Sequence, residues 1–171
     1  MRDGKAILLS AAISLLAIPV AADHRDRPEH DFRATIRGNH EVPVTLSAGH
    51  GSLDLHVNSV DTSMHFVLEY HGLATTVSAA HIHVGKPRTN GGVTVFFCGG
   101  GGRPACPQEG TITGDINAND VIGLAAQQLE ANNFAKLLAA IRDGETYVNI
   151  HTATSPSGEI RGAIVPDKHG R

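Results

Sequence analysis

Three histidines stand where their side chains could share one face of a sheet. His81 and His83 flank one isoleucine in AHIHVG, and His151 follows the run TYVNI. Alternate side chains of a strand point the same way, and residues two apart lie about 7 Å apart along the backbone. In the later run, Val148 and Ile150 form the apolar set opposite His151. If the two strands are neighbours, three imidazoles meet on the outer face of a sheet, under a loop.

Such a cluster has a defined chemistry. Three neutral imidazoles suit Cu(II), Zn(II) or Ni(II), and copper binds most tightly in the Irving–Williams order. We therefore predict a metal site formed by His81, His83 and His151, with copper as the ion and zinc as the alternative. An open fourth position would give such a site a catalytic rather than a structural character.

Other polar residues could complete this site. His65 and His71 are candidates for a fourth ligand, and Asn149 and Thr152 are expected to fix the imidazoles from outside the ligand set. The alternative is that the histidines are incidental, since a His-x-His pair is also common on exposed strands. The remaining histidines are expected at the surface: His24, His30, His40, His50, His56 and His169.

The elements that would position these residues are mostly strands. In SLDLHVN, Leu53, Leu55 and Val57 take one face, and the run from Met64 to Tyr70 alternates in the same way after the turn SVDTS. Further short runs of this kind are FRATIR, AAHIHVG, GGVTVFF, GTITGDI, TYVNIHT and GEIRGAIV. The spacing predicts a mainly β protein, an antiparallel sandwich or barrel.

One segment breaks the strand period. Residues 119–143 carry apolar residues at recurrences of three and four, which favours one or two short helices. A break is expected at Asn132 or Asn133, either of which could act as an N-cap, and Gly144 is expected to end the second helix.

The chain divides into four predicted parts. Residues 1–22 carry a basic start, an apolar run and small residues, as in a secretory signal peptide cleaved between Ala22 and Asp23. The apolar run is short for a membrane span, although an uncleaved anchor is the alternative. A flexible leader (23–31), one domain (32–166) and a tail (167–171) follow. We expect a periplasmic or secreted protein that is not embedded in a membrane once processed.

Charge and cysteine content restrict the partners. The formal net charge is −3 with eleven histidines counted as neutral, so no basic field argues for nucleic acid. Cys98 and Cys106 lie close together in CGGGGRPACP, and in an exported protein we expect them to form a disulfide. The alternative is a thiolate metal ligand.

Several motifs together carry a resemblance to a known family. ATIRGNHEVPV, LEYHGL, AHIHVG, FAKLLAAIRDGETYVNIHT and PSGEIRGAI resemble the chordin-type CHRD domain, over about residues 32–165. The motif order is similar to that of copper/zinc superoxide dismutase, a Greek-key β-sandwich in which a strand His-x-His and a later strand histidine hold copper. The resemblance implies this fold and copper ligation by His81, His83 and His151.

The sequence also departs from that dismutase pattern. KPRTNGGVTVFFCGG follows His83 where a zinc loop rich in histidine would stand, and Arg161 does not coincide with the arginine that guides the substrate. We expect Arg161 to form an ion pair with Glu159, two residues back on the same strand face. No hydrolase motif is found, since Glu69 and Glu159 are single acidic residues.

Three functions remain, in this order. The first is an exported copper protein for storage, delivery or protection. The second is a binding or structural module that does not use metal, because the resemblance includes chordin, an extracellular antagonist of growth factors; its partner would be another exported protein. The third is an enzyme, a copper-dependent oxidoreductase of the dismutase type. Binding is thus favoured over catalysis.

Overall fold

The structure, a computed structural model, describes residues 29–168. The predicted signal peptide (1–22), most of the predicted leader and the last residues of the predicted tail lie outside this range. Within it the chain forms one antiparallel sheet of nine strands. They are β1 (Asp31–Arg37), β2 (His50–Val57), β3 (Ser63–His71), β4 (Val77–Val84), β5 (Gly92–Cys98), β6 (Gly110–Asn117), β7 (Thr146–Thr152), β8 (Ile160–Ala163) and β9 (Val165–Pro166).

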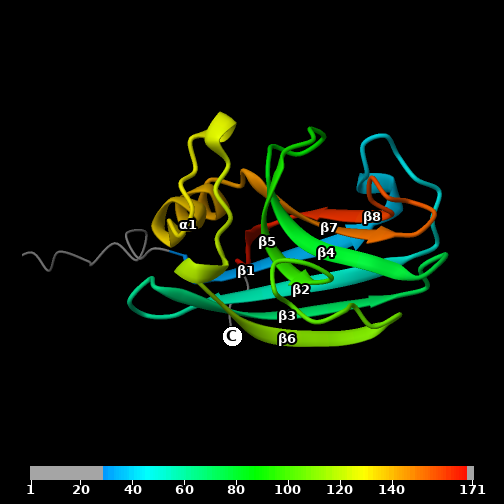
Figure 1. Cartoon of the computed structure of the whole chain (residues 1–171), viewed down its shortest axis with the longest axis horizontal. Helices are drawn as coiled ribbons and strands as arrows, with labels where there is room; N and C mark the ends of the chain where they lie inside the picture. Colours follow the sequence, from blue (N-terminus) through cyan, green and yellow to red (C-terminus); the bar gives the residue numbers. More distant parts are fainter. Residues whose placement is uncertain (1–28, 169–171) are drawn as a thin grey trace, which may run out of the picture.

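The strand order is that of a Greek key. It runs β5-β4-β7-β8-β1-β2-β3-β6, with β9 paired to β1. Strands β5 and β6 stand at the two ends of this order and contact each other, so the sheet is nearly closed into a barrel. The short connection from β3 to β4 and the long one from β6 to β7 place non-consecutive strands side by side (Figure 1). The predicted mainly β, antiparallel fold is confirmed.

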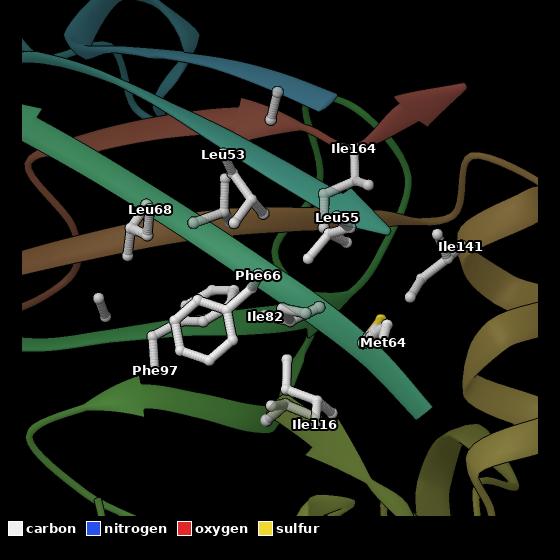
Figure 2. Packing of buried hydrophobic residues seen from close by; sticks show 14 of the residues in the cluster. Leu53, Leu55, Met64, Phe66, Leu68, Ile82, Phe97, Ile116, Ile141 and Ile164 are labelled. Atoms are coloured by element: carbon white, nitrogen blue, oxygen red, sulfur yellow. The ribbon is translucent and has the colours of Figure 1, made fainter. Parts of the chain in front are cut away.

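The inward-pointing side chains of β2 and β3 belong to the hydrophobic core. Leu53 and Leu55 on β2, and Phe66 on β3, are almost fully buried, as the alternation predicted. Figure 2 shows Phe66 beside Phe97 of β5, with ring centroids 4.8 Å apart. Burying one large apolar side chain contributes roughly 1.5–3 kcal/mol, so the face that points inward also fixes which residues must point outward.

Only the second half of the expected helical segment is α-helical. Helix α1 (Phe134–Arg142) lies at one end of the strands; Asn133 is its N-cap, and Gly144 just past its end has a φ of +69°. The first half holds two single turns, η3 (Ala118–Asp120) and η4 (Ala125–Gln127), joined by irregular chain. Here Ile122 donates its N–H to the carbonyl of Thr94 on β5, so the backbone bonds to a strand instead of to itself. No helix within residues 29–168 combines the length and apolar character needed to cross a membrane.

The predicted disulfide is present. Cys98, the last residue of β5, is bonded to Cys106, which closes the glycine-rich loop. Tyr70 of β3 donates its hydroxyl to the carbonyl of Pro107, just past the bridge, at 2.7 Å. The loop is therefore attached to the barrel at both β5 and β3.

One buried carboxylate joins three separate segments. Glu159 accepts hydrogen bonds from the hydroxyls of Ser47 and Thr152 at 2.6 Å each, and from the N–H of Ala74 at 2.9 Å. Burial opposes its ionisation, but these hydrogen bonds outweigh burial and hold the pKa of Glu159 below its usual value. The segment after β1 and the segment after β3 are thereby fixed to the end of β7.

Candidate metal centre

Strands β4 and β7 are antiparallel neighbours, as the candidate site requires. His81 stands opposite Asn149, His83 opposite Tyr147, and His151 opposite Ala79. His81 and His151 are therefore diagonal neighbours on one face of the pair, and His83 follows two residues along the same face. Ile82 and Ile150, on the other face, are fully buried in the core.

The three rings converge. The ring centroid of His81 lies 4.6 Å from that of His83 and 4.4 Å from that of His151. One ring nitrogen from each of the three lies within 4.8 Å of the other two. Nitrogens that share one ion at roughly 2.0–2.1 Å are at most about 4 Å apart, so small ring rotations would complete the geometry.

Backbone carbonyls fix the orientation of two rings. His83 donates Nδ1–H to the carbonyl of Gly91 at 2.9 Å, and His151 donates Nδ1–H to the carbonyl of Pro156 at 3.0 Å. A carbonyl can only accept, so in both rings the lone pair is on Nε2. A hydrogen bond of this kind on the nitrogen facing away from the ion is the usual support of a metal-bound imidazole.

A glycine makes one of these hydrogen bonds possible. A Cβ on Gly91 would lie 1.7 Å from the carbonyl oxygen of Val84, so no other residue could approach the end of β4 so closely. This approach carries the carbonyl of Gly91 to His83. The loop between β4 and β5 thus contacts one ring of the cluster through Gly91.

Three buried nitrogens have no partner. They are Nδ1 of His81, Nε2 of His83 and Nε2 of His151. Buried polar atoms in native proteins are nearly always hydrogen-bonded, so three unpaired nitrogens in one place require an explanation. Each of the two oriented rings presents a lone pair, and a cation bound between the rings would satisfy such a set. The donor set therefore fits a transition metal ion.

Burial also keeps these imidazoles neutral. Loss of solvent, followed by the proximity of His151 and His83, lowers the pKa of His81 to about 3. Burial lowers the pKa of His83 to about 4, despite the hydrogen bond to Gly91, and burial likewise lowers the pKa of His151. Neutral imidazole is the form that binds metal, so the rings are ready to act as ligands near neutral pH.

Aromatic rings line the cluster. Phe96 of β5 meets His81 edge to face at 5.0 Å, and Tyr147 stacks flat on His83 at 4.5 Å with an interplanar angle of 5°. The guanidinium of Arg161 lies 3.3 Å from the centroid of the Tyr147 ring. Because β7 lies between β4 and β8, Tyr147 is held between an imidazole and a guanidinium.

The other predicted site residues lie elsewhere or act differently. His65 and His71 are on β3 and do not join the cluster; they bond Asp115 and Glu69. Asn149 stands directly opposite His81, with its buried Oδ1 unpaired.

Thr152 and Arg161 both have partners other than the expected ones. The hydroxyl of Thr152 donates to Glu159, and no hydrogen bond from it to an imidazole is found among the described residues. The expected ion pair between Arg161 and Glu159 is wrong. Glu159 is fully used by Ser47, Thr152 and Ala74, while Arg161 donates to the carbonyl of Thr89 and to Asn90.

Sequence reasoning missed several contributors. The carbonyls of Gly91 and Pro156 have no side-chain signal at all. Tyr147, opposite His83 on β7, stacks on that ring, and no sequence signal indicated this role. Glu41, in the EVP turn, is 5% exposed with Oε1 unpaired, and only the tertiary structure shows that it is buried.

A family model matches most of the chain. The family model described as CHRD domain matches residues 32–164, which spans all the strands that carry the histidine cluster. No curated protein matches the chain.

Proposed function

The chain belongs to the CHRD domain family, and from this membership and the histidine cluster we propose that the protein binds a transition metal ion, copper in preference to zinc. The ligands are His81, His83 and His151. The observation that carries the proposal is the set of three buried ring nitrogens without partners. Two of these belong to rings that backbone carbonyls already orient.

The preference for copper follows from the donor set. Three imidazoles without a thiolate or carboxylate rank divalent ions in the Irving–Williams order, which places Cu(II) above Zn(II). Among residues 29–168, the ligand group contains three histidines and no acidic side chain, as expected for a site that does not select a hard cation.

The proposed role is storage, delivery or protection outside the cytoplasm. The disulfide between Cys98 and Cys106 supports an oxidising compartment, because such bonds are rare where thiols are kept reduced. The proposed signal peptide over residues 1–22 agrees with this location. In this role the bound ion is cargo or a structural element, and the chain needs no further catalytic group.

A redox enzyme is the second candidate. Three ligands leave a coordination position open, where a bound copper ion could exchange electrons with a small oxidant. The likeness to copper/zinc superoxide dismutase remains a prediction. Superoxide turnover by the copper-loaded protein, compared with free copper at the same concentration, separates this candidate from the first.

Metal stoichiometry tests the proposal. The purified protein is loaded with Cu(II), Cu(I) or Zn(II) in competition with a chelator of known affinity, beside the variants His81→Ala and His151→Ala. We expect one tight copper equivalent, lost in both variants. His65→Ala is the matched control, because it removes an exposed histidine that bonds Asp115.

Two results would count against the metal site. One is the absence of a tight equivalent in the unaltered protein. The other is an equivalent that survives both His81→Ala and His151→Ala, which would place the metal on exposed histidines. Either result would leave a module that binds another exported protein as the better description of this chain.

A further inference from the structure

A second feature of the same outer face is a large cavity beside the histidine cluster. It lies over β1, β7 and β8, between the segment that follows β1 and the loop between β4 and β5. Its volume is about 950 Å³, which is within the range of small-molecule sites. Tyr147 lines the cavity and also stacks on His83, so the cavity and the cluster share one wall.

The lining combines apolar walls with cations. Its apolar lining comes from three separate parts of the chain: Val42, Pro43, Val44, Pro87, Ala163 and Val165. Arg33, Arg88 and Arg161 also line it. A concave surface that is largely apolar, with a few charged groups at fixed positions, is typical of a site for an amphipathic molecule.

Arg161 is the unusual member of this set. Its side chain is 2% exposed, and the acceptors that the structure gives its guanidinium are neutral: Asn90 Oδ1 and the carbonyls of Lys86 and Thr89. Within residues 29–168, no carboxylate lies within 4.0 Å of it. Buried charges are normally paired, so this cation is missing an anion.

The nearest acid does not fill this place. Glu41 is the single carboxylate in the described lining, and it attracts Arg161 from a distance. Its unpaired Oε1 is turned toward Asn149 and Gly158, since a Cβ on Gly158 would meet both Oε1 and the amide of Asn149 at about 2.6 Å. Burial raises the pKa of Glu41 to about 7, which further reduces its negative charge.

Arg33 and Arg88 add to the positive charge. Arg33 has a carboxylate partner in Asp167, at 3.5 Å, outside the lining. Arg88 lies in the loop between β4 and β5, on the same loop as the carbonyls that hold Arg161. The cavity lining therefore carries more positive than negative charge, and one of its cations, Arg161, lies against Tyr147.

We propose that this cavity binds a small organic acid: a carboxylate, directed to Arg161 and Arg88, on an apolar body that packs against Val42, Val44 and Val165. Arginine suits this task because its planar guanidinium presents paired N–H donors that match a carboxylate. The proposal does not depend on a metal, since none of the three histidines lines the cavity.

Binding of a defined pair of probes to the full chain, freed of metal with a chelator, tests this site. The probes are 4-phenylbutyrate and 4-phenylbutanamide, which share an apolar body and differ in charge. Isothermal titration calorimetry should show that the acid binds at least about tenfold more tightly than the amide, because only the acid supplies the missing anion.

Two variants on one loop locate the binding. Val44 lines the cavity and is 60% exposed, whereas Leu46, two residues later, is 99% exposed and not part of the lining. Val44→Glu should weaken binding of the acid by about tenfold or more, while Leu46→Glu, which adds the same charge to the same loop, should change it by less than about twofold.

Every other outcome overturns the proposal. Equal binding of acid and amide would remove the role of the arginines. Absence of binding would remove the site, and equal effects of Val44→Glu and Leu46→Glu would show attraction by overall charge rather than by this cavity. Because both positions are exposed, neither variant is expected to unfold the protein, which thermal melting verifies.

Discussion

Histidines on two outer faces of the same barrel have opposite surroundings. On the outer face of β4 and β7, here called the covered face, His81, His83 and His151 are shielded and their free nitrogens lack partners. On the outer face of β2 and β3, here called the open face, His56 and His65 are exposed.

Three histidines of the open face each have a carboxylate close by, whereas His50 at the start of β2 bonds the carbonyl of Ala48. His56 donates to Asp31 at 2.7 Å, His65 to Asp115 at 2.9 Å, and His71 to Glu69 at 3.0 Å. In each pair the imidazole and the carboxylate are hydrogen-bonded to each other. A high histidine count therefore says little about metal binding, whereas a buried ring nitrogen without a partner is a specific sign of a missing ligand.

The largest expected effect is the response of stability to metal. A copper concentration about one hundredfold above Kd should raise the free energy of unfolding by about 2.7 kcal/mol in the unaltered protein. His83→Ala should abolish this increase because the covered face then offers two imidazoles. His56→Ala, on the open face, should keep it.

Chemical denaturation with and without Cu(II) measures this increase for each protein. The comparison uses the metal-induced difference, since His83→Ala also removes the ring that stacks on Tyr147 and would change the metal-free value. An increase that His56→Ala removes and His83→Ala retains would assign the metal to the open face.

A second effect concerns Glu41, which follows β1 and lies near Asn149 of the covered face. Burial raises its folded-state pKa to about 7, so the folded protein holds a proton that the unfolded chain releases above its ordinary value of 4.5. Stability from this group is thus complete at low pH and is lost as the pH rises toward 7 and beyond. Glu41→Gln should therefore stabilise the protein by about 2 kcal/mol at pH 8 and by much less at pH 5.

Urea denaturation at the two pH values measures the difference. Glu109→Gln serves as the control, because Glu109 is exposed beside the open face. It should change stability by less than about 0.5 kcal/mol at either pH. A gain from Glu41→Gln that is equal at pH 5 and pH 8 would contradict the assignment of the pH dependence to this carboxyl.

A third effect is the loss of one hydrogen bond to Glu159. Thr152→Val keeps the shape of the side chain but removes a donor to a buried carboxylate. We expect a loss of about 1.5 kcal/mol, because the remaining donors cannot replace it. Thr113→Val, at an exposed position of β6 on the open face, should cost less than about 0.5 kcal/mol. Thermal unfolding compares the two variants directly.

The smallest effect is expected from the ion pairs of the open face. Asp115→Asn removes the charge that faces His65, with both side chains at least half exposed. Exposed pairs contribute less than about 1 kcal/mol and are screened by salt, so the stability should hardly change. A loss comparable to that of Thr152→Val would show that the open face is more than a solvated surface.

Much of this arrangement was predictable from the chain alone. The period of two in β2 and β3 predicted which residues enter the core, and the same period placed His81, His83 and His151 opposite the core side. Both depend on local geometry, which a sequence carries. The cysteine pair also needed only proximity along the chain.

The rest depends on contacts between distant segments. The segment around Ile122 has a helical pattern, yet its backbone bonds β5, which no local propensity encodes. Glu159 has three donors, two of them from distant parts of the chain, so Arg161 could not be assigned to it by their spacing of two. The burial of Glu41 likewise arises when loops close over the sheet, an event that the pattern of the EVP turn does not reveal.

Tyr147, held between His83 and Arg161, gives the molecule an optical property of its own. The chain has no tryptophan and two tyrosines, and the other, Tyr70, is buried beside the disulfide loop. Near-ultraviolet emission therefore comes from two phenols, of which one touches both the histidine cluster and the cavity. Paramagnetic Cu(II) bound to His83 would quench the fluorescence of Tyr147. A molecule bound in the cavity would change the intensity of the same fluorescence. A single unlabelled sample could thus report both events by light.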